Sequence, residues 1–418
     1  MIKRISKSAI LSGLAVLLIL GTVLIGGCTG EASTPPGETS IVSDYPGLKP
    51  LVDFVGEENL SVLNLVGFKA ADRAMKELSF GRGDPDILAL TDAGYIAQIG
   101  DYTSEGALDG VIMTAATSRG KGSLINVHKP YNSPLWFAFF DKKSKNCIYL
   151  EAKSDVLKSY LDREKTGRDA ALTDFMKLKD GEIFSRIARE NIDADKLLND
   201  PEAWQKKMIA QVFGGNEFSL FTLSNLWAMG LPNDLMKVAE LHDHICPGIH
   251  SGYMITKYIK ENFPSTNPRK EYTVIAIPPW CKDDAMIQIF ETNVGHRAMY
   301  VKHLTKEQKK ALSGEAKKVA NIFINKKTNK GIVVGFDWPK VYEVAEMPDE
   351  AIAKFRDFTS YWWWWGRLKQ DIALMDYLDK PEEFVCTIKE FDTTPEQIEK
   401  LTTAGVNPLV ELGIMPKP

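Results

Sequence analysis

Cysteine and histidine are scarce in this chain. Its 418 residues include 5 cysteines and 6 histidines, and no two cysteines are spaced as Cys-x-x-Cys. This absence excludes the cysteine pairs of a structural zinc ribbon and of covalent haem attachment. An excess of positive charge is also absent, since the formal net charge is −4, which argues against a nucleic-acid partner. With 44% hydrophobic residues, the chain can form two ordinary globular domains.

The N-terminus has the pattern of an exported lipoprotein. Lys3, Arg4 and Lys7 precede an apolar run that ends in Gly-Gly-Cys at Cys28. This pattern predicts a lipoprotein-type signal peptide over residues 1–28, in which Cys28 carries the lipid after cleavage. An uncleaved transmembrane anchor is the alternative, because the run approaches the ~20 residues that span a bilayer. Both interpretations predict a membrane-anchored protein at the cell surface, outside the cytoplasm.

Three of the six histidines gather around one cysteine in the segment 241–250, Leu-His-Asp-His-Ile-Cys-Pro-Gly-Ile-His. Proline and glycine directly after Cys246 indicate a loop that leads into a helix, and side chains alternate in an extended loop. We therefore expect His242, His244 and Cys246 on one side of residues 242–246. The dipole of the following helix favours the thiolate form of Cys246.

A second cysteine, Cys281, follows a predicted strand and precedes a helix start at Asp283. If the two cysteine segments are neighbours in one sheet, two imidazoles and two thiolates form a tetrahedral site that suits zinc and also accepts copper(I) or iron. The predicted metal ligands are His242, His244, Cys246 and Cys281, with His296, His303 and Asp243 as additional candidates. Two alternatives stay open, a Cys246–Cys281 disulfide and nucleophilic catalysis by Cys246 with a histidine base.

The chain also shows an internal similarity. Asp109, Thr117, Gly120 and His128 recur as Asp284, Thr292, Gly295 and His303 at a constant offset of 175 residues (284 − 109). Upstream, Gly67 resembles Gly252 at the head of a predicted helix. The first copy lacks the His/Cys cluster, because residues 63–67 replace the loop and Gly106 replaces Cys281. The sequence thus predicts two α+β domains in tandem, of which the first is degenerate.

The predicted organisation has six parts. They are a signal peptide (1–28), a flexible stalk (29–45), a degenerate domain (46–155), a helical connector (156–229), a domain with the His/Cys site (230–345) and a helical C-terminal segment (346–418). Within the connector, residues 181–189 are predicted to be helical. The C-terminal segment contains Trp362, Trp363, Trp364 and Trp365, which point in all directions around a helix. We expect these rings to pack between domains, stack on a ligand or meet a membrane.

The second copy resembles a known family. Its His-x-His-x-Cys-Pro-Gly motif, leading into Gly252-Tyr253 and a helix, is similar to the core motif of the FmdE family, which takes its name from formylmethanofuran dehydrogenase. The family's second block resembles residues 281–285 and 292–296. The resemblance covers about 235–337. It implies the same fold for both copies, an archaeal source and a link to the molybdenum- or tungsten-dependent reduction of carbon dioxide in methanogenesis.

The chain departs from this family in two respects. Some members carry a C-terminal zinc finger built on Cys-x-x-Cys pairs, and the ligands for one are absent here. A signal peptide also places the protein on the wrong side of the membrane for a cytoplasmic dehydrogenase complex, whose pterin and iron-sulfur proteins nothing in this chain resembles.

The sequence therefore favours a cell-surface protein that binds a metal ion, zinc first, or a metal-containing ligand and passes it to a transporter. An extracytoplasmic metal-dependent enzyme, hydrolytic or redox, is the alternative, and Asp243 or Asp283 would then be its acidic helper. A scaffold in which the cluster only stabilises the fold is a third interpretation. The pattern allows a homodimer.

Overall fold

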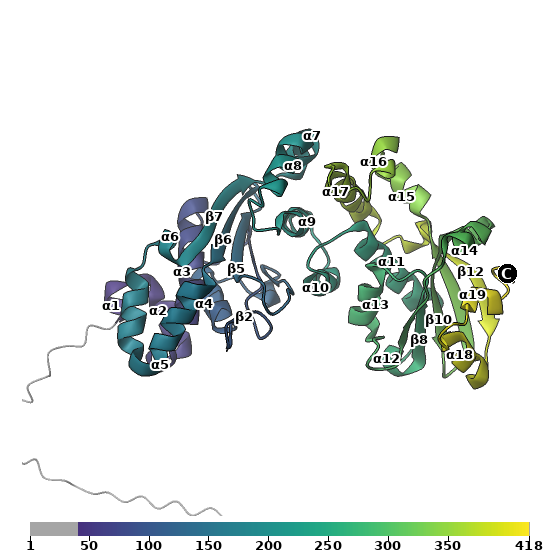
Figure 1. Ribbon diagram of the computed structural model, residues 1–418, viewed down its shortest axis with the longest axis horizontal. Coiled ribbons are helices and arrows are strands. Elements are labelled where there is room, and N and C mark those ends of the chain that lie inside the picture. The colour runs from purple at the N-terminus through teal and green to yellow at the C-terminus, as the bar shows by residue number, and fades with distance from the viewer. Residues whose placement is uncertain (1–40, 418) are drawn as a thin grey trace, which may run out of the picture.

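The computed structural model describes residues 41–417, which form a mixed α+β fold of two lobes joined by helices (Figure 1). This confirms the predicted fold class. The predicted signal peptide with Cys28, and residues 29–40 of the predicted stalk, lie outside the described residues. The end of that stalk is helical, since α1 spans Ile41–Asp44. In the described part of the chain, no helix combines the length and the hydrophobicity needed to cross a bilayer.

The first lobe is built on a five-stranded sheet of order β4-β1-β5-β6-β7. Its strands are β1 (Ile87–Thr91), β4 (Leu124–Asn126), β5 (Trp136–Asp141), β6 (Asn146–Ala152) and β7 (Phe184–Asn191). The short strands β2 (Gln98–Ile99) and β3 (Tyr102–Thr103) form a separate ladder. The helices that enclose the lobe's own core are α3 (Val62–Leu78), α4 (Gly106–Ala115) and α5 (Ser154–Lys177).

The second lobe has a five-stranded sheet of order β12-β11-β10-β8-β9. Its strands are β8 (Tyr272–Ala276), β9 (Met299–Val301), β10 (Val319–Asn325), β11 (Lys330–Phe336) and β12 (Val385–Asp392). Helices α11 (Pro247–Asn262) and α13 (Lys282–Phe290) pack together on one face. The opposite face is covered by α18 (Pro395–Thr402) and α19 (Pro408–Glu411).

The two sheets share their strand order and strand directions. β1 and β8 each pair in parallel with one short strand and antiparallel with the next long strand, and the remaining strands continue antiparallel. The paired helices, α3 with α4 and α11 with α13, also approach each other equally closely. A Cβ on Gly67 would lie 2.1 Å from the backbone oxygen of Ala107, and a Cβ on Gly252 would lie 2.1 Å from that of Lys282. A side chain at either glycine would therefore push the paired helices apart.

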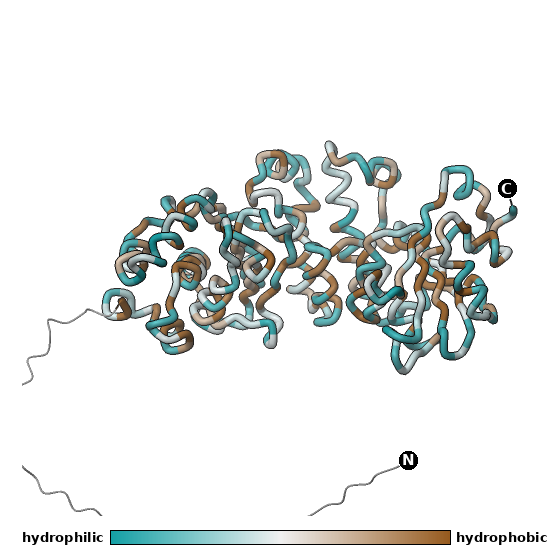
Figure 2. Tube along the Cα trace, turned by 60° about the horizontal axis from the view of Figure 1, so that its bottom comes forward, coloured by the Kyte–Doolittle hydropathy of each residue, from teal (hydrophilic) through white to brown (hydrophobic). Residues whose placement is uncertain are grey.

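Four helices fill the space between the two sheets: α7 (Ala194–Asn199), α8 (Pro201–Ile209), α9 (Glu217–Ala228) and α10 (Asn233–His242). One hydrophobic core runs from Trp136 in the first sheet through Phe221 in α9 to Phe323 in the second sheet. Figure 2 shows hydrophobic segments inside both lobes and in the helices between them. Burial of this apolar surface fixes the lobes relative to each other.

Two segments that were predicted to be helical contain strands. Residues 181–189 lie mostly in β7, and residues 346–418 include β12. In both strands buried and more exposed residues largely alternate along the chain, as expected for strands with one packed face. The helical prediction for residues 181–189 is wrong because a two-residue period was interpreted as a helical one. The domain limits stay predictions, although each sheet extends past them by one strand.

The four tryptophans begin α17 (Trp362–Leu374). Trp364 is fully buried, and its indole nitrogen donates a hydrogen bond to Gln205 of α8 at 2.9 Å. Trp365 donates to a carbonyl of α7 at 2.9 Å, Trp363 packs on a phenylalanine of α9, and Trp362 packs on Trp365. These rings therefore attach the C-terminal helix to the helices between the lobes.

Candidate metal centre

Cys246 and Cys281 occupy matching positions at the starts of two packed helices. Cys246 is the N-cap of α11, where Pro247 fits the first helical position because no amide hydrogen is needed there. Cys281 is the N-cap of α13. Gly248 lies between the cysteines, since a Cβ on it would be 2.7 Å from the Cβ of Cys281. A residue without a side chain at this position lets the two thiols meet.

His242 completes a cluster of three. It is the last residue of α10, and the chain turns away at Asp243 with a φ of 69°. The ligand atoms of His242, Cys246 and Cys281 all lie within 4.8 Å of one another, and the Nε2 of His242 is 3.9 Å from the Sγ of Cys246. One imidazole and two sulfurs form a donor set for zinc or another soft transition metal. The structure thus brings together three of the four predicted ligands, although His242 is helical and not extended.

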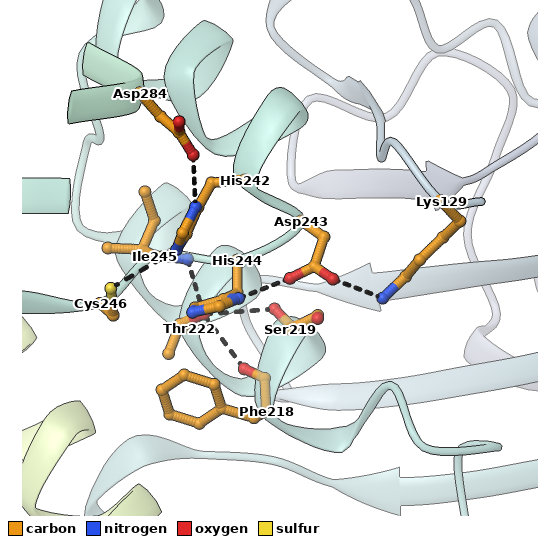
Figure 3. Close-up of polar contacts among 10 residues, drawn as sticks. All are labelled: Lys129, Phe218, Ser219, Thr222, His242, Asp243, His244, Ile245, Cys246 and Asp284. Carbon is orange, nitrogen blue, oxygen red and sulfur yellow. Dashed lines mark hydrogen bonds and ion pairs between the residues drawn. The ribbon is translucent and has the colours of Figure 1, made fainter. Parts of the chain in front are cut away.

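A carboxylate on α13 orients the imidazole. The Oδ2 of Asp284 lies 2.7 Å from the Nδ1 of His242 (Figure 3). This hydrogen bond places the proton on Nδ1 and leaves Nε2, the nitrogen that faces Cys246, free to bind a metal. In the sequence, Asp284 stands out only as the residue that matches Asp109 beside a predicted helix start, and this role was missed. Its place one helical turn after Cys281 was the available signal.

Even when no metal is bound, the cluster favours the thiolate form of Cys281. A hydrogen bond from Cys246 and the proximity of His242 lower the pKa of Cys281 to about 5, despite its burial. The same hydrogen bond, together with burial, raises the pKa of Cys246. Burial lowers the pKa of His242, but hydrogen bonds to Asp284 and Cys281 outweigh this effect and raise it to about 9. A metal ion would replace the protons of Cys246 and His242.

His244 lies beside the cluster without joining it. Its ring centroid is 4.5 Å from that of His242, but its Nδ1 is turned to Asp243 at 2.5 Å. The other oxygen of Asp243 accepts a hydrogen bond from Lys129 of the first lobe at 2.9 Å (Figure 3). Burial opposes ionisation of Asp243, yet His244 and Lys129 outweigh it and lower its pKa to about 2. His244 is therefore held by a carboxylate that the first lobe anchors.

The remaining candidates lie outside the cluster. His296 is exposed, and its Nδ1 is 3.0 Å from the backbone oxygen of Glu291. His303 is exposed at the edge of a cavity. Asp283, an expected acidic helper, is buried in an ion pair with Lys282 at 2.7 Å. The structure thus does not bring these three to the thiols.

A buried histidine–aspartate pair lies next to the cysteines. The Nδ1 of His250 is 3.0 Å from the Oδ1 of Asp371 on α17, and both side chains are completely buried. The backbone amide of His250 donates to the carbonyl of Cys246 at 3.1 Å. Burial raises the pKa of Asp371. The pair ties α17 to the start of α11, so His250 has a structural role.

A cavity of about 630 Å³ opens beside the two cysteines. Gly248 forms part of its wall, and a Cβ on this residue would lie 3.4 Å from the Sγ of Cys281 and 3.5 Å from the Sγ of Cys246. Trp280 and Lys282, the sequence neighbours of Cys281, also line the cavity. The C-terminal segment contributes Arg367 from α17. Burial lowers the pKa of Arg367, while its electrostatic interactions with Cys246, Asp371 and Cys281 oppose that change. The cavity and the cysteine pair therefore share a wall.

An α+β domain with a His/Cys cluster at two helix starts defines a candidate metal-binding protein. Residues 241–386, about a third of the chain, match the family model described as FmdE, Molybdenum formylmethanofuran dehydrogenase operon. The matched segment includes the whole cluster, so the chain carries an FmdE-family domain. This confirms the family resemblance for residues 241–386. No curated protein matches the chain.

Proposed function

We propose that the FmdE-family domain binds one transition-metal ion, zinc first, through His242, Cys246 and Cys281. The observation that carries this proposal is the convergence of their ligand atoms within 4.8 Å. A thiolate-rich site of this kind holds zinc tightly, and the ion supplies Lewis acidity to whatever occupies its fourth position. Asp284 supports the site by keeping the imidazole oriented.

The setting of this site is also part of the proposal. The basic residues before the apolar run and the Gly-Gly-Cys at Cys28 support an exported, lipid-anchored protein. Such a protein holds a metal ion or a metal-containing ligand at the membrane surface and passes it to a transporter. The FmdE resemblance links the metal to enzymes of methanogenesis only through the family's name.

The first lobe is, in this proposal, a degenerate copy of the second. The shared strand order supports it, as do the parallel pairs Ala89–Leu124 and Val274–Met299, which correspond at offsets of 185 (274 − 89) and 175 (299 − 124) residues. Ser61 caps α3 where Cys246 caps α11, so the counterpart of the His/Cys loop ends at Ser61 and is not the segment 63–67 that was expected from the sequence. A Cβ on Gly106 would lie 3.5 Å from the Ser61 hydroxyl oxygen.

The degenerate copy contributes support in place of ligands. Lys129 holds Asp243 behind His244, and Arg119 forms an ion pair with Glu240 of α10. The backbone amide of Asn126 also donates to the side chain of Glu240 at 3.2 Å. The first lobe thus anchors both the helix that ends at His242 and the turn that follows it.

A metal-dependent enzyme, hydrolytic or redox, is the second candidate. The cavity of about 630 Å³ beside a three-donor site favours it, because catalytic zinc sites use three protein ligands and bind substrate in a neighbouring pocket. Turnover would distinguish it from the binding protein.

Elemental analysis tests the shared core of both candidates. The full-length chain would be purified anaerobically without affinity metals, beside a Cys246→Ser/Cys281→Ser variant and a Cys386→Ser control. Cys386 is a free, partly exposed cysteine of β12. We expect one metal per chain in the parent and the control and none in the double variant. A metal-free parent, or equal metal in all three proteins, would refute the proposal.

A further inference from the structure

The cavity beside the cysteines is strongly basic. Its cationic lining residues are Lys282, Lys309, Lys317, Lys318, Arg356 and Arg367. No aspartate or glutamate belongs to the lining, which lies entirely within the described residues. A cavity lined by charge of one sign focuses an attractive field on ligands of the opposite sign.

Two of these cations are neutralised within the protein. Lys282 pairs with Asp283, and Lys318 pairs with Asp337 at 2.9 Å and with Glu315 at 3.0 Å. The other four, which form no ion pair among residues 41–417, are Lys309, Lys317, Arg356 and Arg367. These four charges are available to a ligand.

Arg367 is the best positioned of the four. Its guanidinium donates to the carbonyls of Phe355 at 3.0 Å and Trp363 at 2.6 Å, which fixes the side chain in place. Both acceptors are neutral, and the half-buried Arg367 forms no direct ion pair among residues 41–417, although Cys246, Asp371 and Cys281 lie near enough to oppose the lowering of its pKa by burial. A fixed guanidinium of this kind binds phosphate or carboxylate oxygens with good geometry.

Aromatic side chains form the rest of the cavity wall. Trp338 packs on Trp280 and Phe336, with ring centroids 5.5 and 4.9 Å apart. Trp280 is 38% exposed and Phe358 is 65% exposed, although both are large and apolar. Exposed rings at the edge of a cavity are suited to stack on a planar ligand.

We propose that this cavity binds a small anionic ligand that carries a planar aromatic ring. Its anionic group pairs with Lys309, Lys317, Arg356 and Arg367, and its ring packs on the aromatic wall. Gly248 separates this space from the thiols, so a bound ligand lies next to Cys246 and Cys281. Contact between this ligand and the metal rests on the metal-binding function proposed above, whereas binding in the cavity does not.

Calorimetric titration of the full-length chain with adenosine 5′-monophosphate as a probe tests this proposal. The neutral adenosine and the ringless inorganic phosphate are the comparison ligands. We expect binding of one monophosphate per chain, about tenfold or more tighter than either comparison ligand. Equal affinity for adenosine or for phosphate would overturn the proposal, as would absence of monophosphate binding.

Charge reversal locates the site. Lys309→Glu/Lys317→Glu should weaken monophosphate binding by about tenfold or more, because two of the four unpaired cations are replaced by acids. The matched control Lys306→Glu/Lys310→Glu changes the same net charge on exposed residues of α14 (Lys306–Ala311) outside the cavity lining. Equal losses in both variants would overturn the assignment to the cavity.

The Cys246→Ser/Cys281→Ser variant separates this proposal from the metal site. We expect it to lose metal and to keep monophosphate affinity within about twofold, since the cavity's cations are untouched. A failure of metal binding alone therefore leaves the cavity proposal standing. Loss of monophosphate binding in this variant would overturn it, because the probe would then be bound by the metal.

Discussion

Asp284 and His242 are joined by a 2.7 Å hydrogen bond that connects the first turn of α13 to the last residue of α10. Asp284 thereby controls which imidazole nitrogen faces Cys246. Cys281 is the N-cap of the same helix α13, so one helix start supplies both a thiol ligand and the carboxylate that orients the histidine. The geometry of the cluster therefore depends on the packing of α10 against α13.

Removal of this carboxylate should weaken metal binding. Asp284→Ala leaves the imidazole free to rotate, and loss of such a partner typically costs 10–100-fold in metal affinity, so we expect a decrease of roughly that size. Competition with a chromophoric chelator measures it. Asp109→Ala, at the corresponding place in the first lobe, should leave affinity unchanged. Equal affinity of the Asp284 variant and the parent would show that the bond does not orient a ligand.

The two neighbouring histidines should differ in their effect on the metal. His242→Ala removes a donor and should abolish stoichiometric metal binding, whereas His244→Ala should keep most of it, because the His244 Nδ1 is hydrogen-bonded to Asp243. Metal content after gel filtration provides the readout. If both variants lose the metal equally, His244 is a ligand and the four-donor site expected from the sequence is the correct one.

The sequence predicted the chemistry of the site better than its geometry. The concentration of histidine and cysteine identified His242, Cys246 and Cys281, because metal donors are rare in this chain. The structure leaves His244 outside the three-residue cluster, since the alternation rule holds for extended chain and α10 continues to His242. Asp284 was missed because its hydrogen bond joins two helices, a contact that local sequence patterns do not contain.

The cavity was also beyond sequence analysis. Its wall combines Gly248 with residues such as Lys317 and Arg367, which are separated in the chain and come together only in the folded domain. The fold class and the similarity of the two halves could be predicted from periodicity and constant offsets. The outer strands β7 and β12 were not predicted despite their alternating pattern, because each follows a long helical stretch and carries many charged residues.

A methyl group at Gly248 should disrupt the cluster. The Cβ of Gly248→Ala would lie 2.7 Å from the Cβ of Cys281, so α11 and α13 must separate or the thiol must move. We expect a destabilisation of about 1–3 kcal/mol, as for other overpacked sites, together with weaker metal binding. Urea denaturation and metal competition measure the two effects. Gly81→Ala, where nothing lies within 4 Å of the added atom, provides the control. Normal stability and affinity in Gly248→Ala would contradict the close approach.

Asp92 should make the stability of the protein depend on pH. One of its oxygens accepts a hydrogen bond from the backbone amide of Trp136 at 3.0 Å, and the other is buried without a partner among residues 41–417. Burial raises the pKa of Asp92 from 3.8 to about 7. Between these values the folded protein holds a proton that the unfolded chain releases, so stability from this group falls as pH rises from about 4 to 7 and is constant above that range.

Asp92→Asn removes this titration while keeping an acceptor for the Trp136 amide. When the pH rises from 5 to 7.5, the parent should therefore lose a few kcal/mol of unfolding free energy through the ionisation of Asp92. The variant should not show this loss. Urea denaturation of both proteins at the two pH values measures it, and the comparison cancels the titration of all other groups. If the two proteins lose stability in parallel as pH rises, Asp92 is ionised in the fold throughout, and its second oxygen has a partner that lowers its pKa.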